Sequence, residues 1–214
     1  GPVTQVSAGW NHVCATRSDG GVTCWGYSGQ GQTAVPAGPG AVTSVEAGGG
    51  HSCAQLLDGT AACWGGSKFT GEAVVPPGLG PVKQVSAGWH HTCVLKLDGT
   101  MMCWGQNSDG QTAVPPGLNN ITRMVAGENE TCALGADGSV TCWGGKGLGV
   151  DQPPANLGIT TLVDANHAHA CAVAADGSVV CWGYWALGAT DVPANLSGVV
   201  QLSTAGYHTC AITS

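Results

Sequence analysis

The sequence is poor in charge, and above all in basic residues. Of its 214 residues, 6 are Lys or Arg and 13 are Asp or Glu, so the net charge is −7 and only 9% of residues are charged. This balance argues against a nucleic-acid partner, which would require a cluster of basic side chains. It argues equally against binding to anionic lipid. No apolar run approaches the ~20 residues of a membrane helix, so we expect no membrane insertion.

Catalytic and cofactor motifs are missing as well. The sequence has no phosphate-binding loop and no Gly-x-Ser-x-Gly motif. Any metal-ligand pattern in it would have to use its cysteines. Carboxylates outside its Asp-Gly turns are few, and nothing singles out a pair for glycoside hydrolysis. We therefore expect a non-enzymatic protein without cofactor or metal. A glycan-active enzyme remains an alternative.

What the chain does contain is a repeat with a period near 40 residues. In each copy a cysteine follows a histidine, or in one copy Glu130, by two positions, as in the segment AGWHHTC. A fixed period of this length indicates a repeat architecture, in which each copy is one supersecondary unit. We assign the copies of a single domain to residues 1–39, 40–79, 80–118, 119–157, 158–196 and, in part, 197–214.

Each copy predicts three short strands. In the first copy, Val3–Ala8 leads to an Ala-Gly pair, His12–Arg17 carries the His-x-Cys motif, and Val22–Gly26 ends in Cys-Trp-Gly. A Gly/Gln-rich loop and a Val-Pro linker lead to the next copy. Short strands with turns between them are typical of propeller blades, and no 3.6-residue pattern supports a helical solenoid. The predicted fold class is all-β, a propeller of about five complete blades and a partial sixth.

The turn between the second and third strands sets their register. Asp19-Gly20 suits a three-residue loop with glycine in the left-handed conformation, and this places Cys14 opposite Cys24. Opposed Cβ atoms lie ~4.5–5.5 Å apart, so a modest adjustment reaches the ~3.5–4.5 Å that a disulfide needs. The spacing recurs in every complete copy and indicates disulfides in an oxidising compartment; buried thiols in a reducing cell are the alternative. The predicted disulfides are Cys14–Cys24, Cys53–Cys63, Cys93–Cys103, Cys132–Cys142 and Cys171–Cys181.

Two further features bear on the compartment and on partners. Three Asn-x-Ser/Thr sequons, at Asn120, Asn129 and Asn195, fit a secreted glycoprotein. The sixth copy stops soon after its first cysteine, so Cys210 has no partner ten residues on. Its thiol and the strand edges of the incomplete blade are candidates for self-association.

Residues 85–111, VSAGWHHTCVLKLDGTMMCWGQNSDGQ, resemble the RCC1-type β-propeller repeat in their Gly-x-x-His, Asp-Gly and Trp-Gly positions. The period and the cysteine pairs are similar to the ectodomain repeats of CRINKLY4-type plant receptor kinases. The resemblance implies a ring that usually has seven blades and a repeated histidine that is structural. A metal role for that histidine would need thiolates that are not in disulfides. The exchange-factor activity of the family's nuclear member is not expected, since the basic character is absent and the cysteines suit export.

Function is expected where the copies differ. The Cys-Trp-Gly tryptophans repeat and are assigned to core packing. All other aromatic residues fall in the loop after Ala-Gly or the loop after Trp-Gly, which share one rim if the strands alternate in direction. We predict that this rim binds a protein or a glycan, whereas rings that merely cap the core are the alternative. The candidate contact residues are Trp10, Tyr27, Phe69, Trp89, His90, Tyr184, Trp185 and Tyr207.

Taken together, these features predict a non-enzymatic extracellular recognition module that binds a protein or glycan partner. The main alternative is a structural or self-associating ectodomain segment of a larger cell-surface protein.

Overall fold

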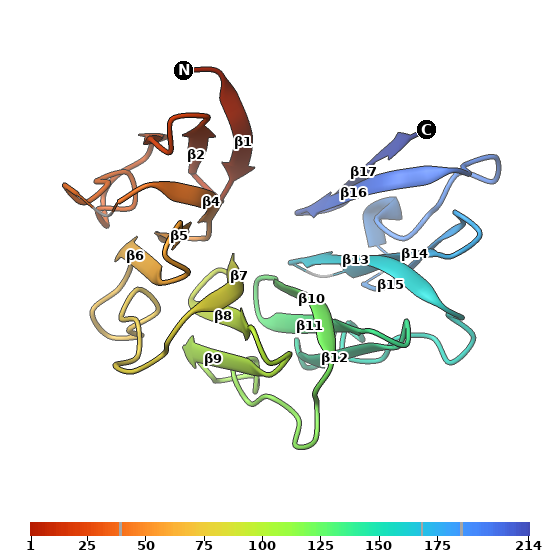
Figure 1. Cartoon of the computed structure of the whole chain (residues 1–214). Helices are drawn as coiled ribbons and strands as arrows, with labels where there is room; N and C mark the ends of the chain where they lie inside the picture. Colours follow the sequence, from red (N-terminus) through yellow and green to blue (C-terminus); the bar gives the residue numbers. More distant parts are fainter. Residues whose placement is uncertain (39, 168, 185) are drawn as a thin grey trace. The chain divides into compact units, whose positions relative to one another are not determined.

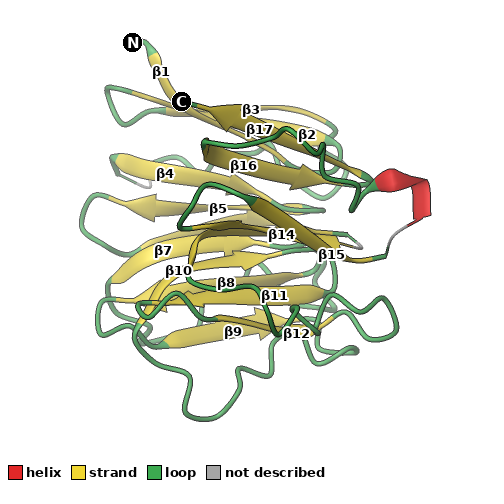
Figure 2. Cartoon of the chain, turned by 90° about the vertical axis from the view of Figure 1, so that its right-hand side faces the viewer, coloured by secondary structure: helices red, strands yellow, loops and turns green. Residues whose placement is uncertain are grey.

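The computed structural model describes residues 1–38, 40–167, 169–184 and 186–214. Six antiparallel sheets follow one another along the chain, one for each repeat, and each is called a blade below (Figure 1). Five blades have three strands and the sixth has two. Loops join the strands, with one 3-10 turn, η1 (Ala186–Gly188), in the described part (Figure 2). Among the described residues, no helix has the length and apolar character to cross a membrane.

The strands are short and nearly equal in length. Those of the first blade have the bounds that the sequence predicts. The strands are β1 (Val3–Ala8), β2 (His12–Arg17), β3 (Val22–Gly26), β4 (Val42–Ala47), β5 (His51–Leu56), β6 (Ala61–Gly65), β7 (Val82–Ala87), β8 (His91–Lys96), β9 (Met101–Gly105), β10 (Ile121–Ala126), β11 (Glu130–Gly135), β12 (Val140–Gly144), β13 (Thr160–Asn166), β14 (His169–Ala174), β15 (Val179–Gly183), β16 (Val199–Ala205) and β17 (His208–Thr213).

The chain forms two compact units, Gly1–Asn107 and Ser108–Ser214. Unit 1 contains the first three blades, and unit 2 contains the fourth, the fifth and the two-stranded sixth. In both units the core lies between successive blades. Val42 and Val45 of β4, for example, pack with Cys14 of β2 and Trp64 of β6. That all six repeats form a single domain remains a prediction.

The turn between β2 and β3 sets the register that the disulfides require. Arg17 N–H donates to Gly21 O (2.9 Å) and Gly20 N–H donates to Arg17 O (2.9 Å), with Gly20 at φ +78°. Cys14 therefore stands opposite Cys24, and their Cα atoms are 4.1 Å apart. The structure contains all five predicted disulfides, each between the second and third strands of one blade.

Cys210, on β17, is an exposed free cysteine. We expect a thiol reagent to modify one cysteine per chain in the native, unreduced protein, because the other ten are in disulfides. Mass spectrometry before and after alkylation measures this, and Cys210→Ser should remove the reactive site. An unreactive chain that migrates as a reducible dimer would instead place Cys210 in an intermolecular disulfide.

Hydrogen bonds between neighbouring blades explain the repeated histidine. Ser52 Oγ donates to Gln32 O (2.8 Å), so it accepts from the Nε2–H of His12, 2.8 Å away. His12 Nδ1 is then a buried acceptor without a partner. Burial accordingly lowers the pKa of His12, and it lowers that of His51 to about 4, which keeps both rings neutral. The same bond recurs between His51 and Thr92 (2.8 Å) and between His169 and Thr209 (2.9 Å).

The junction between the fourth and fifth blades departs from this pattern. Glu130 stands in place of the histidine, and Ala170 stands in place of the hydroxyl residue. Glu130 is fully buried, with Oε2 accepting from Asn129 N–H (3.1 Å) and Oε1 without a hydrogen-bond partner in the described structure. Burial raises the pKa of Glu130 to about 8. The side chain is therefore a neutral carboxylic acid at pH 7.

The Cys-Trp-Gly tryptophans cover the loop of the preceding blade, with one exception. Trp64 is 6% exposed and donates its indole N–H to Gln32 O (2.9 Å), 32 residues earlier. Trp25 is 50% exposed, so the prediction of core packing is wrong for this residue. The other indole bonds run from Trp104 to Glu72, from Trp143 to Gln111 and from Trp182 to Val150.

Candidate recognition surface

In each blade of unit 1, the two aromatic-bearing loops lie at the same end of the sheet. Tyr27 N–H, in the loop after Trp-Gly, donates to Asn11 O (2.8 Å), in the turn after Ala-Gly. Gln106 N–H donates to His90 O in the same way (2.8 Å). The turns are also linked from blade to blade, because Trp10 N–H donates to Gly48 O (3.2 Å). The backbone therefore holds the loop residues at defined positions.

Three of the predicted contact residues form one stack in unit 1. The ring centroids of Trp10 and Trp89 are 4.4 Å apart with an interplanar angle of 14°. The rings of Trp89 and His90 are 5.4 Å apart, also at 14°. Trp10 is 57% exposed, whereas Trp89 and His90 are partly buried. The stack thus ends in an indole that is open to solvent.

Glycines of the second blade make room for this stack. A Cβ on Gly49 would lie 1.7 Å from Cδ1 of Trp89, and a Cβ on Gly50 would lie 1.8 Å from Oε1 of Gln30. Trp89 and Gln30 therefore lie directly over backbone that carries no side chain. In this way Trp89 of the third blade reaches Trp10 of the first.

His90, at the inner end of the stack, faces a buried carboxylate. His90 Nδ1 lies 3.7 Å from Oε1 of Glu72, which is fully buried. Burial opposes ionisation of Glu72, but hydrogen bonds from Ser67 N–H (2.8 Å) and the Thr70 hydroxyl hold its pKa below the usual value. The carboxylate is therefore charged at neutral pH and lies within ion-pairing distance of the imidazole.

A second aromatic group lies in unit 2. His167 Nδ1 contacts Oε2 of Glu128, and His167 Nε2 lies 2.9 Å from the hydroxyl of Tyr207. The two rings meet edge to face, with centroids 4.8 Å apart. Burial lowers the pKa of His167. Tyr207 is 46% exposed, and its hydrogen bond and edge-to-face contact with His167 hold the ring in place.

The remaining predicted contact residues are not brought together. Tyr27, Phe69 and Tyr184 are exposed and make no ring contact within the described ranges. Trp185 lies outside the described residues. No group of three His, Cys, Asp or Glu side chains that could hold a metal occurs in the part of the chain that the structure describes.

Sequence reasoning missed the groups that support the rings. Gly49, Glu72 and the contact of Glu128 with His167 were not assigned a role, although the run AGGGH was a signal for Gly49. It is the one copy with three consecutive glycines before the histidine. A glycine where other copies carry side chains can mark the close approach of another residue.

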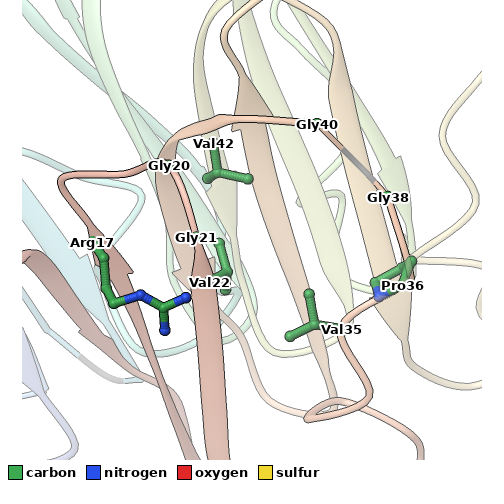
Figure 3. A pocket seen from close by; sticks show the side chains of 9 residues that line it. All are labelled: Arg17, Gly20, Gly21, Val22, Val35, Pro36, Gly38, Gly40 and Val42. Atoms are coloured by element: carbon green, nitrogen blue, oxygen red, sulfur yellow. The ribbon is translucent and has the colours of Figure 1, made fainter. Parts of the chain in front are cut away.

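A hollow lies at the other end of the first blade, and we assign no ligand to it. Its arginine is already engaged, because Arg17 Nη1 donates to Thr23 Oγ1 (2.7 Å) and Nε donates to Asp19 Oδ1 (3.4 Å). The side chains that line the hollow are Arg17, Val22, Val35, Pro36 and Val42 (Figure 3).

The predicted glycosylation sites differ in accessibility. Asn120 and Asn195 are exposed, while Asn129 is partly buried beside Glu130. Glycosylation of all three stays a prediction, and Asn120 and Asn195 have the accessibility that a glycan requires.

Comparison with known proteins identifies the repeat. The family model described as Regulator of chromosome condensation (RCC1) repeat matches residues 3–32 and 82–111, which span the three strands and following loop of the first and third blades. The crystal structure of Prp20p from Saccharomyces cerevisiae is similar over 99% of this chain and 69% of its own, with a TM-score of 0.85 at 15% identity. The fold is that of an RCC1-like β-propeller. The predicted all-β fold with a partial last blade is therefore confirmed.

Two receptor ectodomains are similar to this RCC1-type propeller at higher identity. One is the ectodomain of the receptor kinase CR4 from Physcomitrella patens, with 27% identity and a TM-score of 0.71. The other is the CRINKLY ectodomain of ACR4 from Arabidopsis thaliana, with 26% identity and a TM-score of 0.69. Each match covers 85% of this chain, which spans 50% and 65% of the two relatives. No sequence among curated proteins matches the chain significantly.

Proposed function

We propose that this RCC1-type propeller is a non-enzymatic extracellular recognition module that contacts its partner through the loops bearing the aromatic stack. The observation that carries the proposal is the stack of Trp10, Trp89 and His90. Large aromatic side chains held in place before binding lose little conformational freedom on binding, and they dominate binding energy in many interfaces.

The extracellular placement is supported by two independent features. Five disulfides persist in an oxidising compartment and are rare in the cytosol. The receptor ectodomains are also the relatives with the higher identity.

Binding by this fold has precedent among the relatives. Yeast RCC1 (Prp20), with 16% identity, has been crystallised bound to Kap60, and Prp20p has been studied for binding to Gsp1p and histones. Those partners belong to those proteins. For the present chain, the precedent supports recognition of another molecule rather than catalysis.

Replacing Trp89 with Ala should weaken binding about thirty-fold, since a well-buried contact aromatic contributes ~2 kcal/mol or more. The melting temperature should change little, because the stack lies in loops outside the core between blades. A biotinylated propeller would first capture extracellular partners, and the affinity of each variant would then be measured by biolayer interferometry.

Trp25→Ala is the matched control, because Trp25 is an indole of similar exposure to Trp10, 50% against 57%, and takes no part in the stack. Its affinity should equal that of the wild type. A lower melting temperature for Trp89→Ala with unchanged affinity would show that the rings only cap the fold, and the proposed surface would then be wrong.

A further inference from the structure

We propose that the Trp10–Trp89 stack, with Gln30 beside it, is a binding site for a neutral carbohydrate. This inference rests on the proposed function and names the class of ligand for unit 1. A pyranose ring has an apolar face of C–H groups, which packs on an aromatic face, and a rim of hydroxyls, which pair with amides. The exposed indole of Trp10 offers the first surface, and Gln30 offers the second.

The geometry around Gly49 and Gly50 brings these two kinds of group together. Trp89 lies over Gly49 and Gln30 lies over Gly50, so the indole and the amide cover adjacent residues of one turn. Gln30 is exposed, and its side-chain amide makes no hydrogen bond with another described residue. The amide is therefore available to a ligand hydroxyl.

Trp10 is itself held in place. In the amide orientation that satisfies both groups, Asn11 accepts from Trp10 Nε1 (3.3 Å) and donates to Trp10 O (3.3 Å). With Trp89 stacked on one face, these contacts fix the indole plane. A ring that is ordered before binding loses little entropy when a ligand packs on it.

The charges of unit 1 decide between a neutral ligand and a basic one. Three of its five carboxylates, Asp19, Asp58 and Asp98, lie in the Asp-Gly turns at the other end of the blades. Of the other two, Glu46 accepts from Gln5 (3.2 Å) and Ser7 (3.3 Å), and Glu72 is fully buried. Within unit 1, no exposed carboxylate remains at the aromatic end to pair with an arginine or lysine of a partner. The stacked indoles and Gln30 themselves carry no charge, which suits a neutral sugar. Exposed Lys68, in the loop after Trp64-Gly65, is the cation of this end of unit 1 that makes an anionic sugar the necessary comparison.

The test uses the intact protein with neutral oligosaccharides of defined composition: cello-, xylo-, manno- and chito-hexaose, with an oligogalacturonide as the anionic comparison. We expect at least one neutral hexaose to bind by calorimetry and to change tryptophan fluorescence. Trp10→Ala should weaken this binding about thirty-fold. Trp10→Tyr should retain much of it, because the aromatic face remains. Trp25→Ala should leave it unchanged.

Gly49→Ala tests the arrangement without removing a ring. The added Cβ would meet Trp89 at 1.7 Å, so the indole must move and sugar binding should fall. The same Cβ would also lie 2.6 Å from the backbone oxygen of Trp89, so Gly49→Ala could disturb the turn itself. Gln30→Ala is therefore a second variant, which leaves the turn intact and should weaken sugar binding several-fold.

The outcomes separate the two proposals. Binding of the galacturonide alone, or of no hexaose at about 10 mM, overturns the carbohydrate site. If Trp10→Ala and Trp89→Ala still weaken a captured protein partner, the proposed recognition function stands with a protein ligand. If neither variant changes any binding, the proposed function is wrong as well.

Discussion

Reduction of the five disulfides is expected to unfold the protein under conditions in which the oxidised form is stable. Each disulfide joins cysteines ten residues apart, and a loop of that length contributes ~2–3 kcal/mol through the entropy of the unfolded chain. Five such bonds amount to ~10–15 kcal/mol, as much as the ~5–15 kcal/mol that stabilises a typical domain. Circular dichroism melts with and without a phosphine reductant measure the loss.

Non-reducing peptide mapping supplies the control for this prediction. It should recover each intra-blade pair, and Cys210→Ser should melt as the wild type does, because Cys210 is exposed and forms no intrachain bond. Pairs that join different blades, or free thiols throughout the unreduced protein, would contradict the pairing. A reduced protein that melts at the same temperature would show that packing between blades suffices without the bonds.

Glu130→Gln is expected to make the protein more stable at pH 8–9 and equally stable near pH 4. The pKa of Glu130 rises from 4.5 to about 8 on folding because the side chain is buried. Between these values the unfolded chain has lost the proton and the folded chain retains it, so the stability of the wild type falls as pH rises from 4.5 to 8. The full pKa difference corresponds to ~5 kcal/mol, and the glutamine variant lacks this loss.

Urea denaturation over pH 4–9 measures the effect, as the difference in unfolding free energy between Glu130→Gln and the wild type. The difference should grow steadily through the window and level off above pH 8. A difference that does not change with pH would show that Glu130 ionises normally in the folded protein, which would require solvent to reach it.

The double variant Glu130→His with Ala170→Thr is a structural control at the same junction. It recreates the imidazole–hydroxyl bond that joins His12 to Ser52 and His51 to Thr92. The double variant should be more stable than Glu130→His alone, which leaves a buried imidazole N–H without an acceptor. Equal stability of the two would show that the junction lacks room for this bond.

The features of the fold that the sequence predicted are those set by interactions between residues close together in the chain. The bounds of β1, β2 and β3 followed from the repeated motifs of each copy. The pairing of Cys14 with Cys24 followed from the Asp19-Gly20 turn, because a tight turn sets the register of the two strands that it joins. The same reasoning failed for Trp25. Its motif is identical to that of Trp64, but packing requires a loop of another blade, and the motif carries no information about that neighbour.

The candidate surface was predictable only as a set of loops. The alternation of strand direction put Trp10, Trp89 and His90 at one end of their blades, which the sequence could indicate. It could not indicate that Trp10 and Trp89 touch. Those residues belong to the first and third blades, with the second blade between them, and their contact depends on the rotation between blades and on the space above Gly49.

The sequence by itself therefore determined the repeat, the strands, the disulfides and the end of each blade at which the aromatic residues lie. These depend on backbone periodicity and on turns of a few residues, which act over short distances along the chain. Only the tertiary structure decided which rings stack, that Glu72 faces His90, and that Glu130 is buried without a partner for Oε1. Each of these contacts joins or surrounds side chains from different loops or blades, so their geometry and desolvation exist only once the blades have packed.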